Sequence, residues 1–203
     1  MPEGRACGGI RDRPLLMRTD ASGQSALLMV DVAEVLSARS IPYAVIGAMA
    51  AAVHGVVRAS LDADALVGTQ VTVARDLQRE LTGRGYGTDL RIGDADDPIP
   101  ALLEVTDPFA NRVDLLIGLR GLDAGAMNRV GVVNLLGFPL KVIGREDFVA
   151  MKANAGGPID LADARAVIEM DPSGLDRELV RRVAAGFGRE AARRAESLLA
   201  GTD

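Results

Sequence analysis

Two aspartates stand one residue apart in an apolar stretch of the chain, and a third lies in a second apolar stretch. Asp62 and Asp64 interrupt the run 61–67, and Asp114 interrupts the run 113–117. A charge in such a run is costly unless something neutralises it. Because alternate side chains of a strand share a face, Asp62 and Asp64 project together, with Cα atoms about 6.5 Å apart. Oxygen ligands of this kind suit Mg²⁺ or Mn²⁺, so the three aspartates predict a metal site.

The residues before the aspartate pair are suited to phosphate groups. Gly47 permits close backbone approach, and a helix starting at Ala48 would present N–H groups to a phosphate. Arg58 and Ser60 add a positive charge and a hydroxyl. Phosphoryl and nucleotidyl transfer need cations on the developing charge and a clamp that aligns the reacting groups. These residues therefore predict binding of a nucleoside triphosphate (NTP) beside the metal site.

The same segments resemble a known superfamily. Residues 47–48 (Gly-Ala) and 58–64 (Arg-Ala-Ser-Leu-Asp-Ala-Asp) resemble the G-[GS]…R-x-T-x-D-x-D signature of the nucleotidyltransferases. Within that superfamily, the chain resembles the small bacterial group typified by the AbiEii-type toxins of toxin–antitoxin systems. Asp114 matches the third metal-binding carboxylate. The runs 146–152 and 160–163 resemble the segment E-[DE]-L-x-x-x-K…R-x-K-D-x-x-D, in which a lysine contacts the nucleotide phosphates; its counterpart is Lys152. The resemblance covers roughly residues 43–170.

The resemblance implies a mixed α+β fold and a metal-dependent transferase. We expect a small mixed sheet flanked by helices, followed by a C-terminal helical region. The enzyme would move a nucleoside monophosphate from an NTP to an RNA 3′ end, such as that of tRNA, or to a protein hydroxyl, with a cognate antitoxin or toxin as partner. The cations would be held by the catalytic residues Asp62, Asp64 and Asp114. The triphosphate would be steadied by Gly47, Ala48, Arg58, Ser60 and Lys152.

Several positions depart from the signature. Ala48 stands where Gly or Ser is usual, and Ser60 where Thr is common. Gly157 and Ile159 occupy the places of basic residues before Asp160. These departures leave two other functions open. One is a catalytically impaired protein of the same fold that binds a partner, and the other is an antitoxin-like transferase that modifies a partner toxin.

Individual residues also have simpler explanations. Asp62 would lie at a solvated edge while Asp114 pairs with Arg112 or Arg120. Lys152 would be a solvated or snorkelling side chain on a helix. Asp160 and Asp163 open a predicted helix, where acidic residues favour the helix dipole, so we expect capping rather than catalysis. The lone histidine, His54, is expected to pack or cap. The arginine-rich segment 177–194 is either a solvated helix face or an RNA-backbone contact.

Apolar spacing predicts the elements that position these residues. In the first part we expect helices at 24–39, 48–54 and 71–83, and strands at 43–46, 61–67, 86–92, 101–106 and 112–117. A hairpin follows at 130–136 and 139–142, and then helices at 145–155, 160–170, 173–185 and 189–199. Ser173 is the expected N-cap of the third of these. The predicted organisation is a loose tail over 1–20, an α/β domain over 21–143 and a helical region over 144–203.

Composition bounds the class of protein. The 203 residues are 48% hydrophobic, enough for a good-sized core, and the formal net charge of −5 argues against a strongly basic nucleic-acid binder. Aromatic content of 3%, with no Trp, argues against stacking platforms for single-stranded bases. Cys7 is the only cysteine, which excludes an internal disulfide or a thiolate metal cluster. No apolar run reaches the length of about 20 residues that a membrane span needs, so we expect a cytoplasmic protein.

Overall fold

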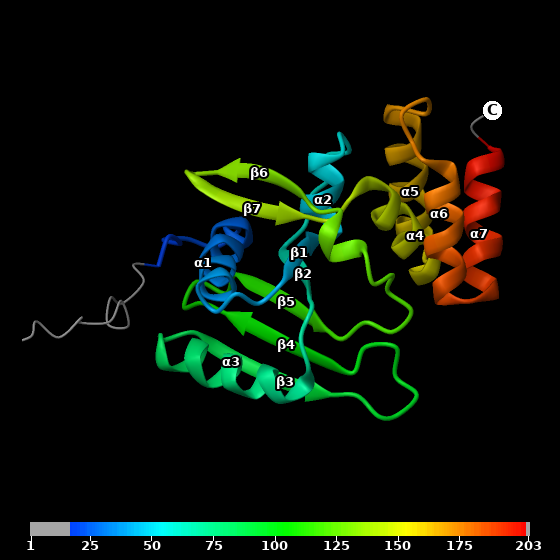
Figure 1. The fold of residues 1–203 in the computed structure, drawn as a ribbon. Helices are drawn as coiled ribbons and strands as arrows, with labels where there is room; N and C mark the ends of the chain where they lie inside the picture. The colour runs from blue at the N-terminus through cyan, green and yellow to red at the C-terminus, as the bar shows by residue number, and fades with distance from the viewer. Residues whose placement is uncertain (1–16, 202–203) are drawn as a thin grey trace, which may run out of the picture.

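The computed structural model describes residues 17–201, which form a seven-stranded mixed sheet and its helices (Figure 1). The strands lie in the order β3-β4-β5-β2-β1-β7-β6. Their bounds are β1 Tyr43–Ile46, β2 Asp62–Val67, β3 Gly87–Ile92, β4 Ala101–Thr106, β5 Arg112–Ile117, β6 Gly131–Leu135 and β7 Phe138–Val142. The predicted fold class, a mixed sheet flanked by helices, is confirmed.

The pairing of the central strands determines what lies beside the aspartates. β2 runs parallel to β5, and this register sets Asp64 opposite Asp114. β1 runs antiparallel to β2, which sets Ile46 opposite Asp64. The end of β1, and the turn that follows it, therefore lie beside the aspartate pair.

Two helices cover one face of the β3-β4-β5-β2 half of the sheet. Helix α1 (Ser25–Ala38) packs on β2 and β5, and α3 (Val71–Gly83) packs on β3 and β4. Alternate residues of β4 and β5, such as Leu103 and Leu115, are fully buried, whereas their neighbours are only partly buried. This alternation is expected of strands with one face on the core and the other toward solvent. We call the second face, which carries Asp62, Asp64, Glu104, Arg112 and Asp114, the open face.

The remaining helices are α2 (Gly47–Val53), the 3₁₀ turn η1 (Ala126–Asn128) and a C-terminal group. That group comprises α4 Arg145–Ala155, α5 Pro158–Met170, α6 Arg177–Phe187 and α7 Arg189–Ala200. Helix α4 packs against each of the other three, and Figure 1 shows the group at one end of the molecule, away from α1 and α3. Among residues 17–201, no helix combines the length and apolar character that crossing a membrane requires.

The helix that follows the turn at residues 171–174 begins later than predicted. Helix α6 starts at Arg177, and the carboxylate of Asp176 caps it by accepting the backbone N–H of Leu179 at 2.9 Å. Ser173 instead donates its hydroxyl to Asp171 at 3.2 Å. The prediction of Ser173 as N-cap is wrong, because the Asp171 carboxylate also accepts the N–H of Gly174 and closes a turn before the helix begins. The short turn η1 was not predicted.

The predicted tail over 1–20 lies mostly outside the described residues, which begin at 17, and so does Cys7. The described end is packed. Met17 lies against the hydrophobic core, and the backbone N–H of Arg18 donates to the buried Asp31 of α1 at 3.1 Å. The side chain of Arg18 also pairs with Asp31 and with Glu34.

A buried ion pair holds the start of α4, the helix that carries Lys152. Asp147 is fully buried, and Arg129 reaches both of its carboxylate oxygens, from Nε at 2.8 Å and from Nη2 at 2.6 Å. Arg129 Nη2 also lies 2.7 Å from Asp123 Oδ1. The loop containing η1 is thereby fixed to the first turn of α4.

We expect Arg129→Met to lower the free energy of unfolding by about 3 kcal/mol, because it leaves the Asp147 carboxylate buried without its partner. Urea unfolding at pH 7.5 measures the loss. Asp123→Asn is the matched control. It weakens only the ion pair of Arg129 with the more exposed carboxylate, and it should lower the free energy of unfolding by less than about 1 kcal/mol. Equal losses in the two variants would contradict the anchoring role of the buried pair.

Candidate functional site

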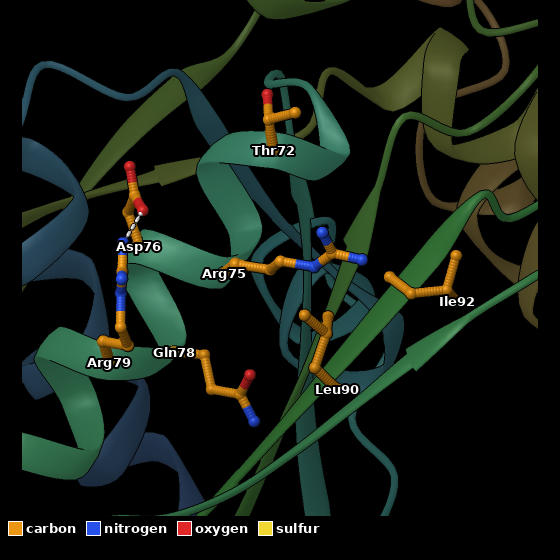
Figure 2. Close-up of a pocket in the computed structure, with 7 residues that line it drawn as sticks. All are labelled: Thr72, Arg75, Asp76, Gln78, Arg79, Leu90 and Ile92. Atoms are coloured by element: carbon orange, nitrogen blue, oxygen red, sulfur yellow. Dashed lines mark hydrogen bonds and ion pairs between the residues drawn. The ribbon is translucent and has the colours of Figure 1, made fainter.

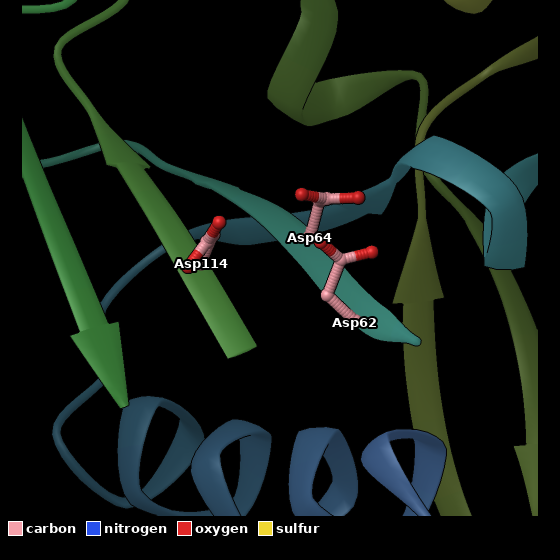
Figure 3. Close-up of side chains that lie close together, drawn as sticks. All are labelled: Asp62, Asp64 and Asp114. Atoms are coloured by element: carbon pink, nitrogen blue, oxygen red, sulfur yellow. The ribbon is translucent and has the colours of Figure 1, made fainter. Parts of the chain in front are cut away.

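The structure brings the three predicted carboxylates together. Asp62 and Asp64 of β2 and Asp114 of β5 each offer an oxygen, and these oxygens all lie within 4.8 Å of one another. Figure 3 shows Asp62 and Asp64 side by side on one strand and Asp114 on its neighbour. All three side chains are partly buried. An oxygen-only set of this size and spacing is suited to a hard divalent cation.

Packing on the opposite face of the sheet fixes this convergence. Ala63 and Ala65 of β2, and Val113 and Leu115 of β5, are buried in the core. A one-residue slip of either strand would move these side chains to the open face and the aspartates into the core. The apolar pattern of the two strands therefore determines where the carboxylates point.

Gly47 lies against the Asp64 carboxylate. The backbone of Gly47 has φ +62°, a left-handed conformation that favours glycine. A Cβ at this position would lie 2.2 Å from Asp64 Oδ2, well inside van der Waals contact. The turn between β1 and α2 therefore passes over Asp64 at a distance that only glycine allows. The next residue, Ala48, is buried and brings no hydroxyl to the site.

The three carboxylates differ in their electrostatic environments. Burial, and then the charges of Asp62 and Asp114, raise the pKa of Asp64 to about 6. Burial also raises the pKa of Asp114, against the opposing effect of Arg112. A hydrogen bond from Ser60 Oγ to Asp62 Oδ1, 2.7 Å long, lowers the pKa of Asp62. The site therefore contains two carboxylates whose charge is disfavoured and one whose charge is stabilised.

Arg112 lies at the site although the sequence did not mark it as a site residue. Its Nη2 is 2.7 Å from Asp62 Oδ2 and 3.4 Å from Asp114 Oδ2. Of the two pairing partners considered for Asp114, Arg112 is thus correct, whereas Arg120 donates to the carbonyl of Ala95. The signal was available, because a residue two positions before Asp114 on a strand must share its face.

Lys152 and Arg58, two cations predicted to hold a triphosphate, meet at the start of α5. Lys152 Nζ lies 2.7 Å from Asp160 Oδ1 and 3.0 Å from Asp163 Oδ2, and its side chain is only 12% exposed. Arg58 Nε donates to the same oxygen of Asp163 at 3.2 Å. The alternative of a solvated Lys152 is therefore wrong. The charge of Lys152 also acts to lower the pKa of Asp64, so Lys152 interacts electrostatically with the aspartate site.

The acidic residues of α5 have different roles. Asp160 lies in the first turn, where it favours the helix dipole as predicted. Asp163 lies beyond that turn and is buried, so capping does not describe it. It is the shared partner of Arg58 and Lys152.

His54 and the arginine-rich segment have structural partners. His54 Nε2 lies 2.9 Å from the carbonyl of Ile143, and its ring packs edge-on against Phe148, which confirms the packing role. Burial lowers the pKa of His54. In the C-terminal helices, Arg181 pairs with Glu178 and Glu196, and Arg193 and Arg194 both pair with Glu190. These pairs agree with a solvated helix face.

A shallow groove between α3 and β3 lies apart from the aspartates. Figure 2 shows the residues that line it: Thr72, Arg75, Asp76, Gln78, Arg79, Leu90 and Ile92. Leu90 pairs with Leu103, whose buried side chain belongs to the helix-covered face. The groove is therefore on the opposite side of the sheet from Asp62, Asp64 and Asp114, and it is not part of the candidate site.

Comparison with known proteins identifies the fold. No protein-family profile and no curated protein matches the chain by sequence. Among solved structures, a proposed nucleotidyltransferase from Thermotoga maritima superposes with a TM-score of 0.53 at 13% identity, over 75% of this chain and 97% of the other. An antigenic nucleotidyltransferase-like protein from Paracoccidioides brasiliensis gives 0.49 at 14% identity, over 90% and 95%. The lincomycin-bound lincosamide antibiotic adenylyltransferase LnuA gives 0.48 at 11% identity, over 75% and 99%.

The fold assignment rests on the Thermotoga protein, which has the highest TM-score of these three. The chain has the nucleotidyltransferase-like fold that the sequence predicted. At this level of identity the likeness concerns the fold, so the AbiEii-type subgroup and the roles of individual site residues stay predictions.

The opposite pKa shifts of Asp62 and Asp64 predict opposite effects of neutralising them in metal-free protein. In the folded protein the pKa of Asp64 lies above its ordinary value of 3.8. The free energy of unfolding therefore falls as the pH rises from about 4 to 6, since the unfolded chain releases this proton first. Asp64→Asn should therefore raise the free energy of unfolding at pH 7.5, by on the order of 2 kcal/mol, and by less at pH 4.5.

Asp62→Asn is the matched control, because Asp62 lies two residues from Asp64 on the same strand, β2. The pKa of Asp62 is lowered, so its contribution to stability is present above its unfolded pKa, and the variant should be less stable at pH 7.5. Urea unfolding in EDTA at both pH values measures both variants. Shifts of the same sign at pH 7.5 would show that the two carboxylates do not differ as described.

Gly47→Ala should disturb the site through Asp64 itself. Left-handed strain alone costs about 1 kcal/mol, and the clash with Asp64 should bring the loss of unfolding free energy to about 3 kcal/mol. In an Asp64→Ala background the clashing atoms are gone, and the loss should return to about 1 kcal/mol. Gly137→Ala is the control, because its φ of +83° carries similar strain with nothing within 4 Å of the added Cβ. A cost of Gly47→Ala that does not depend on Asp64 would disprove the contact.

Proposed function

We propose that the protein is a metal-dependent nucleotidyltransferase that uses an NTP. The observation that carries this proposal is the meeting of three carboxylates within 4.8 Å on the open face of a sheet with the nucleotidyltransferase-like fold. Charge repulsion at Asp64, and the buried Oδ1 of Asp114, which has no hydrogen-bond partner among the described residues 17–201, both indicate carboxylates suited to a cation. Mg²⁺ or Mn²⁺ held by Asp62, Asp64 and Asp114 would neutralise charge on the triphosphate during transfer.

In this proposal the side chains have distinct tasks. The oxygen of the acceptor hydroxyl bonds to the α-phosphorus, and the bond between that phosphorus and pyrophosphate breaks. Asp114 would complete the cation site and help to receive the proton of the hydroxyl, because its Oδ2 is held less closely by Arg112 Nη2, at 3.4 Å, than Asp62 Oδ2 is, at 2.7 Å. Asp62 and Asp64 would hold the cations together with Asp114, and Ser60 orients Asp62 through its hydrogen bond.

The triphosphate would be bound by residues on two sides of Asp64. Gly47 and Ala48 would offer backbone N–H groups at the turn between β1 and α2. Lys152 and Arg58 would supply positive charge, and Asp160 and Asp163 hold both side chains in place beforehand. Such pre-organised cations lose little side-chain freedom when a phosphate arrives.

The proposed acceptor is a hydroxyl group of a macromolecule. The resemblance implies an RNA 3′ end or a protein side chain, with a role in a toxin–antitoxin pair. Three of the six arginines in the segment 177–194 are ion-paired to glutamates: Arg181, Arg193 and Arg194. Those pairs reduce the positive charge that this segment would present to an RNA backbone, and both acceptors stay part of the proposal.

A second candidate function is a partner-binding protein with little catalysis. It is favoured by Gly157 and Ile159, which stand where the resemblance places basic residues, and by the exposed, apolar side chain of Ile159. Fewer positive charges at the start of α5 would weaken the hold on a nucleotide.

Label transfer from α-³²P-NTPs in the presence of Mn²⁺ or Mg²⁺ distinguishes the two functions. Wild type should label a macromolecule from a cell extract, and Asp114→Ala should lower the rate at least about a hundredfold. Asp89→Asn, a charge change two strands away on the same sheet, should leave the rate within about twofold. Digestion of the product with protease or ribonuclease identifies the acceptor. Wild type that transfers no label and binds no Mn²⁺ would favour the partner-binding function.

A further inference from the structure

A row of acidic side chains crosses four strands of the open face. Asp64 on β2 lies opposite Asp114 on β5, Asp114 opposite Glu104 on β4, and Glu104 opposite Asp89 on β3. The predicted cation ligands are thus only the first part of a longer line of negative charge. Two arginines of the same sheet, Arg112 and Arg91, pair with members of this line.

Arg112 is placed between the candidate cation ligands and the rest of the row. Its Nη2 is 2.7 Å from Asp62 Oδ2 and 3.4 Å from Asp114 Oδ2, while its Nη1 is 3.8 Å from Glu104 Oε2. The guanidinium therefore already touches carboxylates on both sides. Its Nε is buried and has no hydrogen-bond partner among residues 17–201, so the present contacts leave a donor unused.

We propose that Arg112 is the resident counter-ion of the cation site and that it exchanges with the metal. In metal-free protein it neutralises Asp62 and Asp114, and on metal binding it transfers to Glu104. The inference rests on the proposed function, because it takes these aspartates as metal ligands. It makes Arg112 a positioning residue, which sets how tightly the site binds a divalent cation.

Competition for the same two carboxylates is the physical basis of the exchange. A cation bound between Asp62 and Asp114 would repel a guanidinium at 2.7 and 3.4 Å from their oxygens. Glu104 is a ready alternative, since it pairs directly across from Asp114 and lies near Nη1. Arg91 Nη2, 3.2 Å from Glu104 Oε2, holds that carboxylate in place. The metal affinity of the site then depends on how much more stable Arg112 is beside Asp62 and Asp114 than beside Glu104.

Mn²⁺ titration without nucleotide tests the exchange, with paramagnetic resonance of free Mn²⁺ as the readout. Arg112→Gln should tighten Mn²⁺ binding about fivefold, the equivalent of one partly exposed ion pair. Arg120→Gln is the matched control: it removes the same charge just beyond the end of the same strand, but the Arg120 guanidinium donates to the carbonyl of Ala95 instead of to a carboxylate of the row. Its effect should stay within about twofold.

Glu104→Gln tests the destination of the guanidinium. In wild-type background it should weaken Mn²⁺ binding about threefold, because Arg112 has lost its second partner. In an Arg112→Gln background the same change should have little effect, since no guanidinium remains to be relocated. An equal effect of Glu104→Gln in both backgrounds would show simple electrostatic attraction to the metal and would overturn the exchange.

Thermal unfolding separates an exchange from a merely structural role of Arg112. Arg112→Gln should lower the melting temperature in EDTA and give a larger rise on adding Mn²⁺ than wild type does. A lower melting temperature with unchanged Mn²⁺ affinity would overturn the inference and leave the proposed function standing. Binding by Arg112→Gln but not by wild type would support the inference strongly. Absence of binding in both proteins would overturn the inference and the metal-dependent function together.

Discussion

The mutual repulsion of three carboxylates on one patch of sheet is the constraint to which the surrounding structure responds. Asp64, between the other two charges and partly buried, has its pKa raised to about 6. Each nearby polar contact offsets part of that repulsion: Ser60 and Arg112 act on Asp62, Arg112 reaches Asp114, and Lys152 acts on Asp64 through its charge. A fold that only needed stability would not gather these charges. Their arrangement is the one that the proposed cation site requires.

The architecture keeps the carboxylates in place at the expense of local freedom. Parallel pairing of β2 with β5 sets Asp64 opposite Asp114, and the buried residues beneath them prevent any slip of register. Gly47 closes the site from the β1 side, so close to Asp64 that a methyl group would overlap its carboxylate. Because alternate residues of β4 and β5 are fully buried while their neighbours on the open face are only partly buried, the same strands are fixed on one side and accessible on the other.

Local pattern was enough to predict most of the elements, and the nonlocal contacts explain what was missed. Strands such as 101–106 and 112–117 carry their polar residues at alternate positions, Glu104 and Thr106 in one and Arg112 and Asp114 in the other, so the sequence indicates both strands. The convergence of Asp62, Asp64 and Asp114 was predicted from strand alternation together with family resemblance. The placement of Arg112 between two aspartates depends on register with a strand 50 residues earlier, and the burial of Asp163 depends on Arg58, 105 residues away. Strand alternation places Arg112 on the same face as Asp114, but a local pattern reveals neither the contact of Arg112 with Asp62 nor that of Arg58 with Asp163.

The helical region contributes to the candidate site instead of merely following it. Asp163 of α5 accepts Arg58, which precedes the aspartate pair, and Lys152 of α4 is held by Asp160 and Asp163. Helix α4 is in turn fixed by the buried pair of Arg129 and Asp147. A boundary near residue 144 therefore separates the sheet from the helices, but the ion pairs of Arg58 and Lys152 with Asp163 connect the two sides. Any nucleotide whose phosphates meet Lys152 and Arg58 while its metal meets Asp62 and Asp64 would bridge both regions, so nucleotide binding should depend on the packing of the helices as much as on the sheet.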